Sequence, residues 1–364
     1  MQPLWTESFG NPASVEHHRG LAAADRVDVA RQQTAHAIGA ESREIIFTSG
    51  ATEANNIAVL GAARFRSKHE GRRRVLVFET EHSCVLGAAN ALVEEGFDVC
   101  FLPVDAEGFA DLAALADALD NQTALVCLMA ANNEVGTIQP IAKAAALAHA
   151  HGAWLHSDAA QAVGKVDLDV RTLEVDLLSL SGHKIYGPMG VGALYVRRRP
   201  RVRLSPLMHG GGQERGIRAG TLPTPLIVGL GEAIGWAVSE QTDLATRHRQ
   251  LKQAFLDRLE TSSLTYVLNG PVDEALRLPG NLSLSFPEIP RDTLFASMAD
   301  FGIAVSSGSA CSSHDVAPSH VLTAMGIDAR VAQQTLRIGL GRDTTKANLA
   351  ALEMALVAAH QRVT

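Results

Sequence analysis

Short β-rich apolar runs that alternate with helical stretches constrain the fold of this chain most strongly. Between them, segments such as 111–119 and 141–151 are rich in Ala and Leu and helical in character. Alternation of this kind is typical of a mostly parallel sheet with helices on both faces. We therefore expect an α/β fold whose seven-stranded sheet is formed by residues 44–48, 74–78, 99–104, 124–129, 153–157, 176–179 and 192–196.

The last third of the chain has a different pattern. Residues 226–261 carry apolar residues at helical spacing without an internal proline, which predicts one long helix leaving the large domain. Two strand-like runs, 281–286 and 303–306, and a C-terminal helix from Thr345 follow. This part of the sequence predicts a smaller α+β domain.

The length of the chain predicts two domains. Single hydrophobic cores rarely grow beyond about 250–300 residues, and this chain has 364 residues, of which 46% are hydrophobic. We expect a large domain at 9–240 and a small C-terminal domain at 241–364, with residues 1–8 beside the small domain or the substrate pocket.

Charge and hydropathy exclude several classes of protein. The 32 basic and 39 acidic residues give a net charge of −7, without the dense Lys/Arg stripe of a nucleic-acid binder. No run approaches the roughly 18 apolar residues of a membrane span, and the first residues lack the pattern of a signal peptide. We expect a cytoplasmic protein with no direct nucleic-acid or membrane contact.

Residues 45–56 predict a strand that runs through a small-residue turn into a helix. The N–H groups at such a helix start attract a phosphate, and the Thr52 hydroxyl beside Ala51 adds a donor. Ser-Gly turns before helices are also common without a ligand, so a turn without a phosphate remains the alternative interpretation. No Gly-Lys-Ser/Thr follows, which excludes a P-loop.

Two further polar groups follow predicted strands. Lys184, between glycines and beside His183, is a candidate Schiff-base lysine whose amine partial burial would keep reactive, or an ordinary surface lysine. Asp158 ends an apolar strand, where ligands bind in open α/β sheets. It would hold a pyridinium nitrogen protonated, or serve as the N-cap of the following helix.

The four cysteines, Cys84, Cys100, Cys127 and Cys311, are too widely spaced for a CxxC pair or a disulfide framework. Cys100 and Cys127 lie in apolar runs and are expected to be core thiols. Cys311 lies among Ser and Gly residues, which indicates an exposed thiol. An ordinary structural role for Cys311 remains the alternative. No Cys or His spacing predicts a permanent metal site.

Eight segments of the sequence form one ordered set of motifs, namely residues 9–14, 48–53, 80–82, 132–136, 158–161, 181–184, 218–221 and 306–313. Together they resemble the cysteine desulfurases of bacteria and mitochondria. The resemblance runs from about residue 9 to the end, and the loop around Cys311 matches the group with Ser-Ser-Gly-Ser-Ala-Cys.

The resemblance implies a fold-type I pyridoxal-phosphate transferase that works as a homodimer on L-cysteine. Sulfur would pass to a cysteine persulfide and then to an acceptor such as an iron–sulfur scaffold or a tRNA-thiolation enzyme. A transient iron–sulfur ligand role for Cys311 stays open, as does a related lyase or aminotransferase, for example a selenocysteine lyase.

The resemblance also implies roles for individual residues. Lys184 would bind the cofactor and move protons, and Cys311 would accept sulfur. Arg337 suits a substrate carboxylate because its planar fork binds one in a bidentate manner. In the cofactor site, His82 would stack on the pyridine ring, Asp158 would pair with the ring nitrogen, and Gln161 would bond the phenolic oxygen. The phosphate would be held by Ala51, Thr52, Ser181 and His183, together with Thr221 of the other subunit. Asn133 would bind the substrate carboxylate together with Arg337.

One departure from the family lies at the N-terminus. Members usually carry an additional strand and turn before the Phe-Gly-Asn-Pro segment, and this chain starts eight residues before Phe9. That piece normally lines the substrate side of the pocket. A non-catalytic sulfur-relay or scaffold-binding protein therefore stays open as an alternative to the enzyme.

Overall fold

The computed structural model describes residues 1–307 and 317–364, and these divide into two compact units. Unit 1 comprises Met1–Leu102, Asp111–Ala130 and Pro140–Gln241, and unit 2 comprises Pro103–Ala110, Ala131–Gln139 and Thr242–Thr364. Residues 1–8, expected beside the small domain or the substrate pocket, group with unit 1. Whether the units are the folding domains expected from the sequence stays a prediction.

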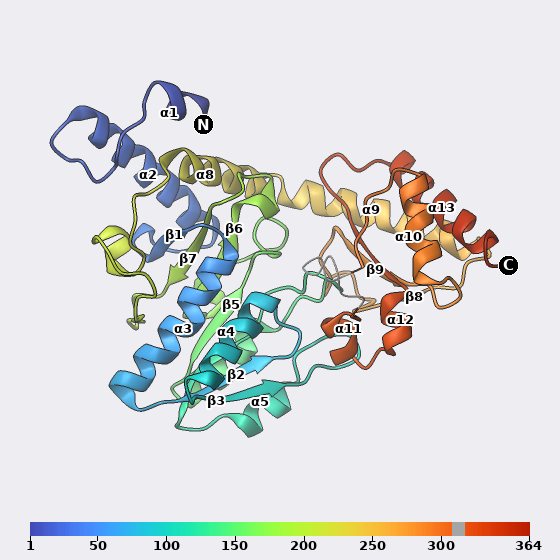
Figure 1. Cartoon of the computed structure of the whole chain (residues 1–364), viewed down its shortest axis with the longest axis horizontal. Coiled ribbons are helices and arrows are strands. Elements are labelled where there is room, and N and C mark those ends of the chain that lie inside the picture. Colours follow the sequence, from blue (N-terminus) through green and yellow to red (C-terminus); the bar gives the residue numbers. More distant parts are fainter. Residues whose placement is uncertain (308–316) are drawn as a thin grey trace. The chain divides into compact units, whose positions relative to one another are not determined.

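Unit 1 is an α/β structure (Figure 1). Its strands are β1 (Ile45–Thr48), β2 (Arg74–Phe78), β3 (Asp98–Leu102), β4 (Thr123–Cys127), β5 (Trp154–Asp158), β6 (Leu177–Ser181) and β7 (Gly192–Val196). Its helices are α1 (Gln2–Thr6), α2 (His18–Ala37), α3 (Ala51–Glu70), α4 (Ser83–Glu94), α5 (Leu112–Ala118), α6 (Ile141–Ala150), α7 (Val170–Leu173) and α8 (Thr224–Ser239), with short 3₁₀ turns η1 (Ser42–Glu44), η2 (Gly182–Ile185) and η3 (Gln213–Gly216).

Among the described residues, seven strands form one sheet in the order β1-β7-β6-β5-β4-β2-β3. The pairs β2–β3, β2–β4, β4–β5 and β5–β6 are parallel, and β7 is antiparallel to both β6 and β1. β1 therefore points in the same direction as β6. The mostly parallel, seven-stranded sheet expected from the sequence is confirmed.

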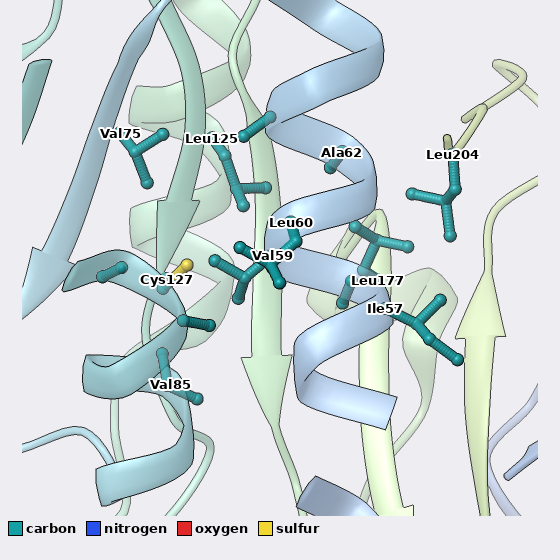
Figure 2. Close-up of a cluster of buried hydrophobic side chains, with 14 of the residues drawn as sticks. Ile57, Val59, Leu60, Ala62, Val75, Val85, Leu125, Cys127, Leu177 and Leu204 are labelled. Carbon is teal, nitrogen blue, oxygen red and sulfur yellow. The ribbon is translucent and has the colours of Figure 1, made fainter. Parts of the chain in front are cut away.

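The core of unit 1 lies between the sheet and helices α3 and α4 (Figure 2). Ile57 and Val59 of α3 pack with Leu125 of β4 and Leu177 of β6. Every residue of β1, β4, β6 and β7 is buried. Burial of both alternating faces is typical of a sheet that other elements cover on both sides.

Local sequence signals set the ends of several helices. α3 ends at Gly71, whose φ of 72° is the left-handed conformation that glycine adopts without strain. Asp111 begins α5 by accepting hydrogen bonds from the N–H groups of Ala113 and Ala114.

Unit 2 contains a three-stranded antiparallel sheet in the order β10-β9-β8 among its described residues. Leu251, Leu284 and Leu356 belong to its core, which lies between this sheet and the helices that contain residues 241–260 and 346–361. The elements are α9 (Gln241–Glu260), which starts at the end of unit 1, β8 (Val267–Leu268), β9 (Asn281–Ser285), α10 (Arg291–Asp300), α11 (His320–Ala324), α12 (Ala329–Gln333), β10 (Thr335–Gly339) and α13 (Lys346–Gln361). α13 begins after a capping box of Thr345 and Asn348, where the sequence predicts a helix.

Three expectations differ from the structure. The single helix expected at 226–261 is two helices, α8 and α9, which meet at Glu240. The strand expected at 303–306 is reduced to an isolated bridge between Ser306 and Arg337. Cys100 is half-buried rather than a core thiol, because β3 is an edge strand, whereas Cys127 on central β4 is buried.

No helix in residues 1–307 or 317–364 is long and apolar enough to cross a membrane.

Gly192 lies where β1, β6 and β7 meet. It pairs with Thr48 of β1 on one side and with Ser181 of β6 on the other. A Cβ at this position would lie 2.5 Å from the backbone oxygen of Leu180 and 2.7 Å from the Cα of Gly50. The close approach of these backbones therefore requires glycine.

We predict that Gly192→Ala lowers the free energy of unfolding by about 1–3 kcal/mol, because the backbones must move apart. The matched control is Gly235→Ala on α8, where a Cβ meets no atom of the described residues within 4 Å. This control should gain about 0.5–1 kcal/mol from helix propensity. Urea unfolding of both variants measures the difference, and an unchanged value for Gly192→Ala contradicts the close approach.

Candidate functional site

The direction of the strands gathers several of the candidate residues of unit 1 at one edge of its sheet. β1, β2, β5 and β6 all point the same way, so the segments that follow them emerge at the same edge. These segments carry Ala51 and Thr52 after β1, His82 after β2, Asp158 at the end of β5, and Ser181, His183 and Lys184 at the end of β6. Ligands bind at this edge in open α/β sheets.

The start of α3 forms a cradle with the end of β6. Gly50 precedes the helix with φ 150°, a conformation open essentially to glycine only, and it has no side chain to cap the first N–H groups. Among the described residues, a Cβ at Gly50 would find one atom within 4 Å, the Ser181 hydroxyl at 3.9 Å. Ser181 Oγ also lies 2.9 Å from His183 Nδ1. Helix N–H groups, hydroxyls and an imidazole together suit an anion.

Asp158 is a buried carboxylate, 6% exposed, at the end of β5. Its Oδ2 accepts a hydrogen bond from Asn55 Nδ2 at 2.7 Å, and its Oδ1 accepts the N–H of Ala160 at 2.9 Å. Residues 160–165 form turns and not a helix, so Asp158 is not the N-cap of a following helix, the alternative that the sequence left open. Asn55 is completely buried on α3, one turn after Thr52.

Burial raises the pKa of Asp158, because removal from water disfavours the charged carboxylate. The hydrogen bonds from Ala160 and Asn55 act in the opposite direction. The electrostatic effects of Lys184 and of the His82 imidazole also favour the carboxylate. Asp158 therefore interacts with the two predicted catalytic groups of unit 1.

His82 caps α4, and its contacts define its neutral tautomer. The backbone N–H of Cys84 donates to Nδ1 of His82 at 3.3 Å, so this nitrogen carries a lone pair and the neutral ring holds its proton on Nε2. Cys84 Sγ lies 3.0 Å from the same Nδ1 and accepts from Asn55 Nδ2 at 3.2 Å. Burial raises the pKa of Cys84 to about 11, so the sulfur is a thiol at neutral pH.

Lys184 lies in the 3₁₀ turn η2, directly after β6. Its side chain is exposed within the single chain, which differs from the partial burial expected from the sequence. Desolvation and then the charge of Lys184 lower the pKa of His183. Lys184 thus acts electrostatically on both the cradle and the buried carboxylate.

Gln161 and Thr221 complete the expected cofactor residues of unit 1. Gln161 is half-buried after β5, and its Oε1 accepts a hydrogen bond from Lys165 Nζ at 2.7 Å. Thr221 is exposed in the segment before α8. Its expected place in the site of the other subunit stays a prediction.

The two expected substrate-binding residues meet in unit 2. Arg337 on β10 donates from Nη1 to the backbone oxygen of Asn133 at 3.4 Å. Asn132 shapes the segment of Asn133, because its Oδ1 accepts the N–H groups of Glu134 and Val135. The structure therefore brings together two residues that lie about two hundred positions apart in the chain.

Glu134, directly after Asn133, holds a second contact in unit 2. Its carboxylate accepts a hydrogen bond from the hydroxyl of buried Ser319 at 2.5 Å, and burial raises its pKa. Ser306 exchanges two backbone hydrogen bonds with Arg337, at 2.7 and 3.3 Å. Cys311 lies between Ser306 and Ser319 in the sequence, outside the described residues.

Comparisons with known proteins decide the family. The family model "Aminotransferase class-V" matches residues 1–352. The protein "Cysteine desulfurase IscS" of Rickettsia bellii (strain OSU 85-389) is 47% identical over 346 residues, which are 95% of this chain and 83% of that protein. This chain belongs to the cysteine desulfurase family.

Solved structures agree with this assignment. A "NifS-like protein" is 36% identical with a TM-score of 0.89, and the match covers 98% of this chain and 93% of that one. A structure described as "SspA in complex with cysteine" is also 36% identical, with a TM-score of 0.79 and 93% of each chain covered. The resemblance and the fold class expected from the sequence are confirmed, and class-V aminotransferases use pyridoxal phosphate.

Sequence reasoning missed several residues around the site of this cysteine desulfurase. Asn55 lies one helical turn after Thr52 on α3, and this spacing was an available signal. Lys165 lies four positions after Gln161 in a turn segment, where helical spacing gives no such signal. Nothing in its sequence neighbourhood distinguished Cys84. Its role beside His82 follows from the tertiary structure alone.

Within residues 1–307 and 317–364, no group of three or more His, Cys, Asp or Glu side chains is placed to hold a metal ion.

We predict that Asn55→Leu lowers the free energy of unfolding by about 1–3 kcal/mol at neutral pH, because the buried Asp158 carboxylate loses a donor. Loss of the donor raises the native pKa of Asp158 further above its unfolded value of about 3.9. The deficit should therefore grow as the pH rises through the native pKa and shrink at acid pH.

Urea unfolding between about pH 4 and pH 8 measures this dependence. Asn56→Leu is the control, because the Asn56 amide bonds the backbone of its own helix at the surface. Its effect should stay within about 0.5 kcal/mol at every pH. A pH-independent deficit for Asn55→Leu contradicts the assigned contact.

Proposed function

We propose that this protein is a working cysteine desulfurase that converts L-cysteine to L-alanine. The thiol of Cys311 takes up the substrate sulfur as a persulfide, so cysteine and a thiol are consumed and alanine and a persulfide are formed. Membership of the cysteine desulfurase family supports this reaction. The single structural observation that carries it is the buried Asp158 carboxylate, which interacts with both His82 and Lys184 at one sheet edge.

Pyridoxal phosphate is the proposed cofactor, and the residues of unit 1 fit it. The cradle of Gly50, Ser181 and the start of α3 would accept the phosphate, because a side chain at Gly50 would occupy this space. The buried Asp158 would face the pyridine nitrogen, and Gln161 the phenolic oxygen. His82 would stack on the ring, and Lys184 would form the covalent link. A phosphate, an aromatic ring and an aldehyde thus each have a matching group.

When bound, the cofactor serves as an electron sink that makes the substrate α-proton acidic. The Asp158 carboxylate would stabilise a proton on the ring nitrogen, with Asn55 and Ala160 holding the carboxylate in place. The Nζ of Lys184 would move the proton at the substrate α-carbon. The neutral His82 would present its Nε2–H, because Nδ1 is occupied by the N–H of Cys84.

Arg337 and Asn133 would bind the substrate carboxylate. The planar guanidinium of Arg337 matches a carboxylate in a bidentate geometry. Its hydrogen bond to the backbone oxygen of Asn133 holds the two residues next to each other within unit 2. The Cys311 thiolate would attack the substrate sulfur, because the thiolate is the reactive form of cysteine.

The proposal extends to partners and location. The protein would act as a homodimer in the cytoplasm, with Thr221 of one subunit at the phosphate of the other. A thiol of an acceptor protein, in iron–sulfur cluster assembly or tRNA thiolation, would collect the persulfide sulfur. Gel filtration and transfer of radiolabelled sulfur to a candidate scaffold test these points.

We predict that Cys311→Ser keeps the visible absorbance of bound pyridoxal phosphate but reduces sulfide release from L-cysteine under reductant by about 100-fold or more. The hydroxyl cannot form a persulfide. Cys100→Ser, on the edge strand β3, is the matched control and should retain full release. Sulfide release by Cys311→Ser at the unaltered rate would point to a lyase that needs no thiol.

We predict that Lys184→Ala abolishes the covalent absorbance of the cofactor and lowers alanine formation by about 10²–10⁴-fold, because the proton-transferring amine is lost. A visible spectrum before and after addition of cysteine provides the measurement. Lys143→Ala on the exposed side of α6 serves as the control. An unaltered protein that stays colourless with added pyridoxal phosphate would instead support a non-catalytic relay.

A further inference from the structure

A second lysine lies beside the proposed cofactor residues. Lys165 is half-buried in the segment that follows β5, four positions after Gln161. Its Nζ donates a hydrogen bond to Gln161 Oε1 at 2.7 Å. The charge of Lys184 acts on the same Lys165 amine. Lys165 therefore interacts with two of the expected cofactor residues, and the roles assigned above do not use it.

This contact fixes the orientation of the Gln161 amide. A protonated lysine amine has three N–H donors and no lone pair, so the amide atom that it contacts must be the oxygen. The Gln161 NH₂ group is then directed away from Lys165 and is available as a donor. An amide without such a partner can present either its oxygen or its nitrogen.

We propose that Lys165 is a positioning residue that holds Gln161 as a hydrogen-bond donor to the phenolic oxygen of the cofactor and adds a positive charge beside Lys184. The inference rests on the proposed function, because it needs pyridoxal phosphate bound at Lys184. It assigns a task to a residue that does not itself touch the reacting atoms.

The electrostatics around Lys165 support this assignment. Burial and then the positive charge of Lys184 lower the pKa of Lys165 to about 8, so its amine is mostly protonated at neutral pH. The charge of Lys184 also acts on the carboxylate of Asp158 and on the ring of His183. Because the interaction is mutual, the Lys165 ammonium disfavours a proton on the Lys184 nitrogen.

Both effects change the titration of the bound cofactor in the same direction. A donor at the phenolic oxygen stabilises its anionic form, and a nearby cation disfavours protonation of the Lys184 nitrogen. Lys165 thus lowers the pH at which the visible absorbance of the bound cofactor changes. A residue that only supported the fold would leave this midpoint unchanged.

The test is a pH titration of the visible spectrum of the protein loaded with pyridoxal phosphate. Lys165→Met should raise the midpoint by about one pH unit, whereas Lys165→Arg, which keeps the charge and the donor, should stay close to the unaltered protein. Lys143→Met makes the same change at an exposed position of α6. The midpoint of this control should not move.

An unchanged midpoint in Lys165→Met, with cofactor bound, overturns the inference and leaves the proposed function intact. Absence of cofactor binding in the unaltered protein overturns the proposed function itself, so the two failures are distinguishable. If Lys165→Met does not fold, Gln161→Leu decides. A raised midpoint there supports the donor role, and an unchanged one refutes it.

Discussion

The common direction of β1, β2, β5 and β6 is the constraint on which the site of unit 1 depends. Parallel strands leave the sheet at one edge, so four segments separated by long stretches of sequence end side by side. β7 lies between β6 and β1 and is antiparallel to both, so β1 runs in the same direction as β6. Gly192 makes that arrangement possible, because its missing Cβ lets the β6 and Gly50 backbones approach.

Burial of charge at this edge gives the site its chemical character. A carboxylate out of water is costly unless donors and cations surround it. Asp158 has donors in Asn55 and Ala160, a nearby cation in Lys184, and the His82 imidazole, whose electrostatic effect also favours the carboxylate. Partial burial likewise raises the pKa of Cys84, which keeps it a neutral thiol beside His82. Groups with displaced pKa values thus gather at the edge where the cofactor is proposed to bind.

Much of the fold was open to prediction because its signals are local. The strands of unit 1 were located within one or two residues, since short apolar runs between glycine and polar turns have few alternatives. The break at Glu240 was not predicted, because no proline or glycine marks it. Cys100 was misplaced in the core, because position at the edge of a sheet depends on strand order and not on local composition.

The sequence by itself determined the α/β class, the family and the identities of the candidate groups, because each motif is a short continuous segment with its own chemistry. Only the tertiary structure decided which groups touch. The contacts of Asn55 with Asp158, of Cys84 with His82, and of Arg337 with Asn133 join segments that are separate in the chain. Strand order and helix packing set such distances, and both depend on interactions across the whole unit rather than on neighbouring residues.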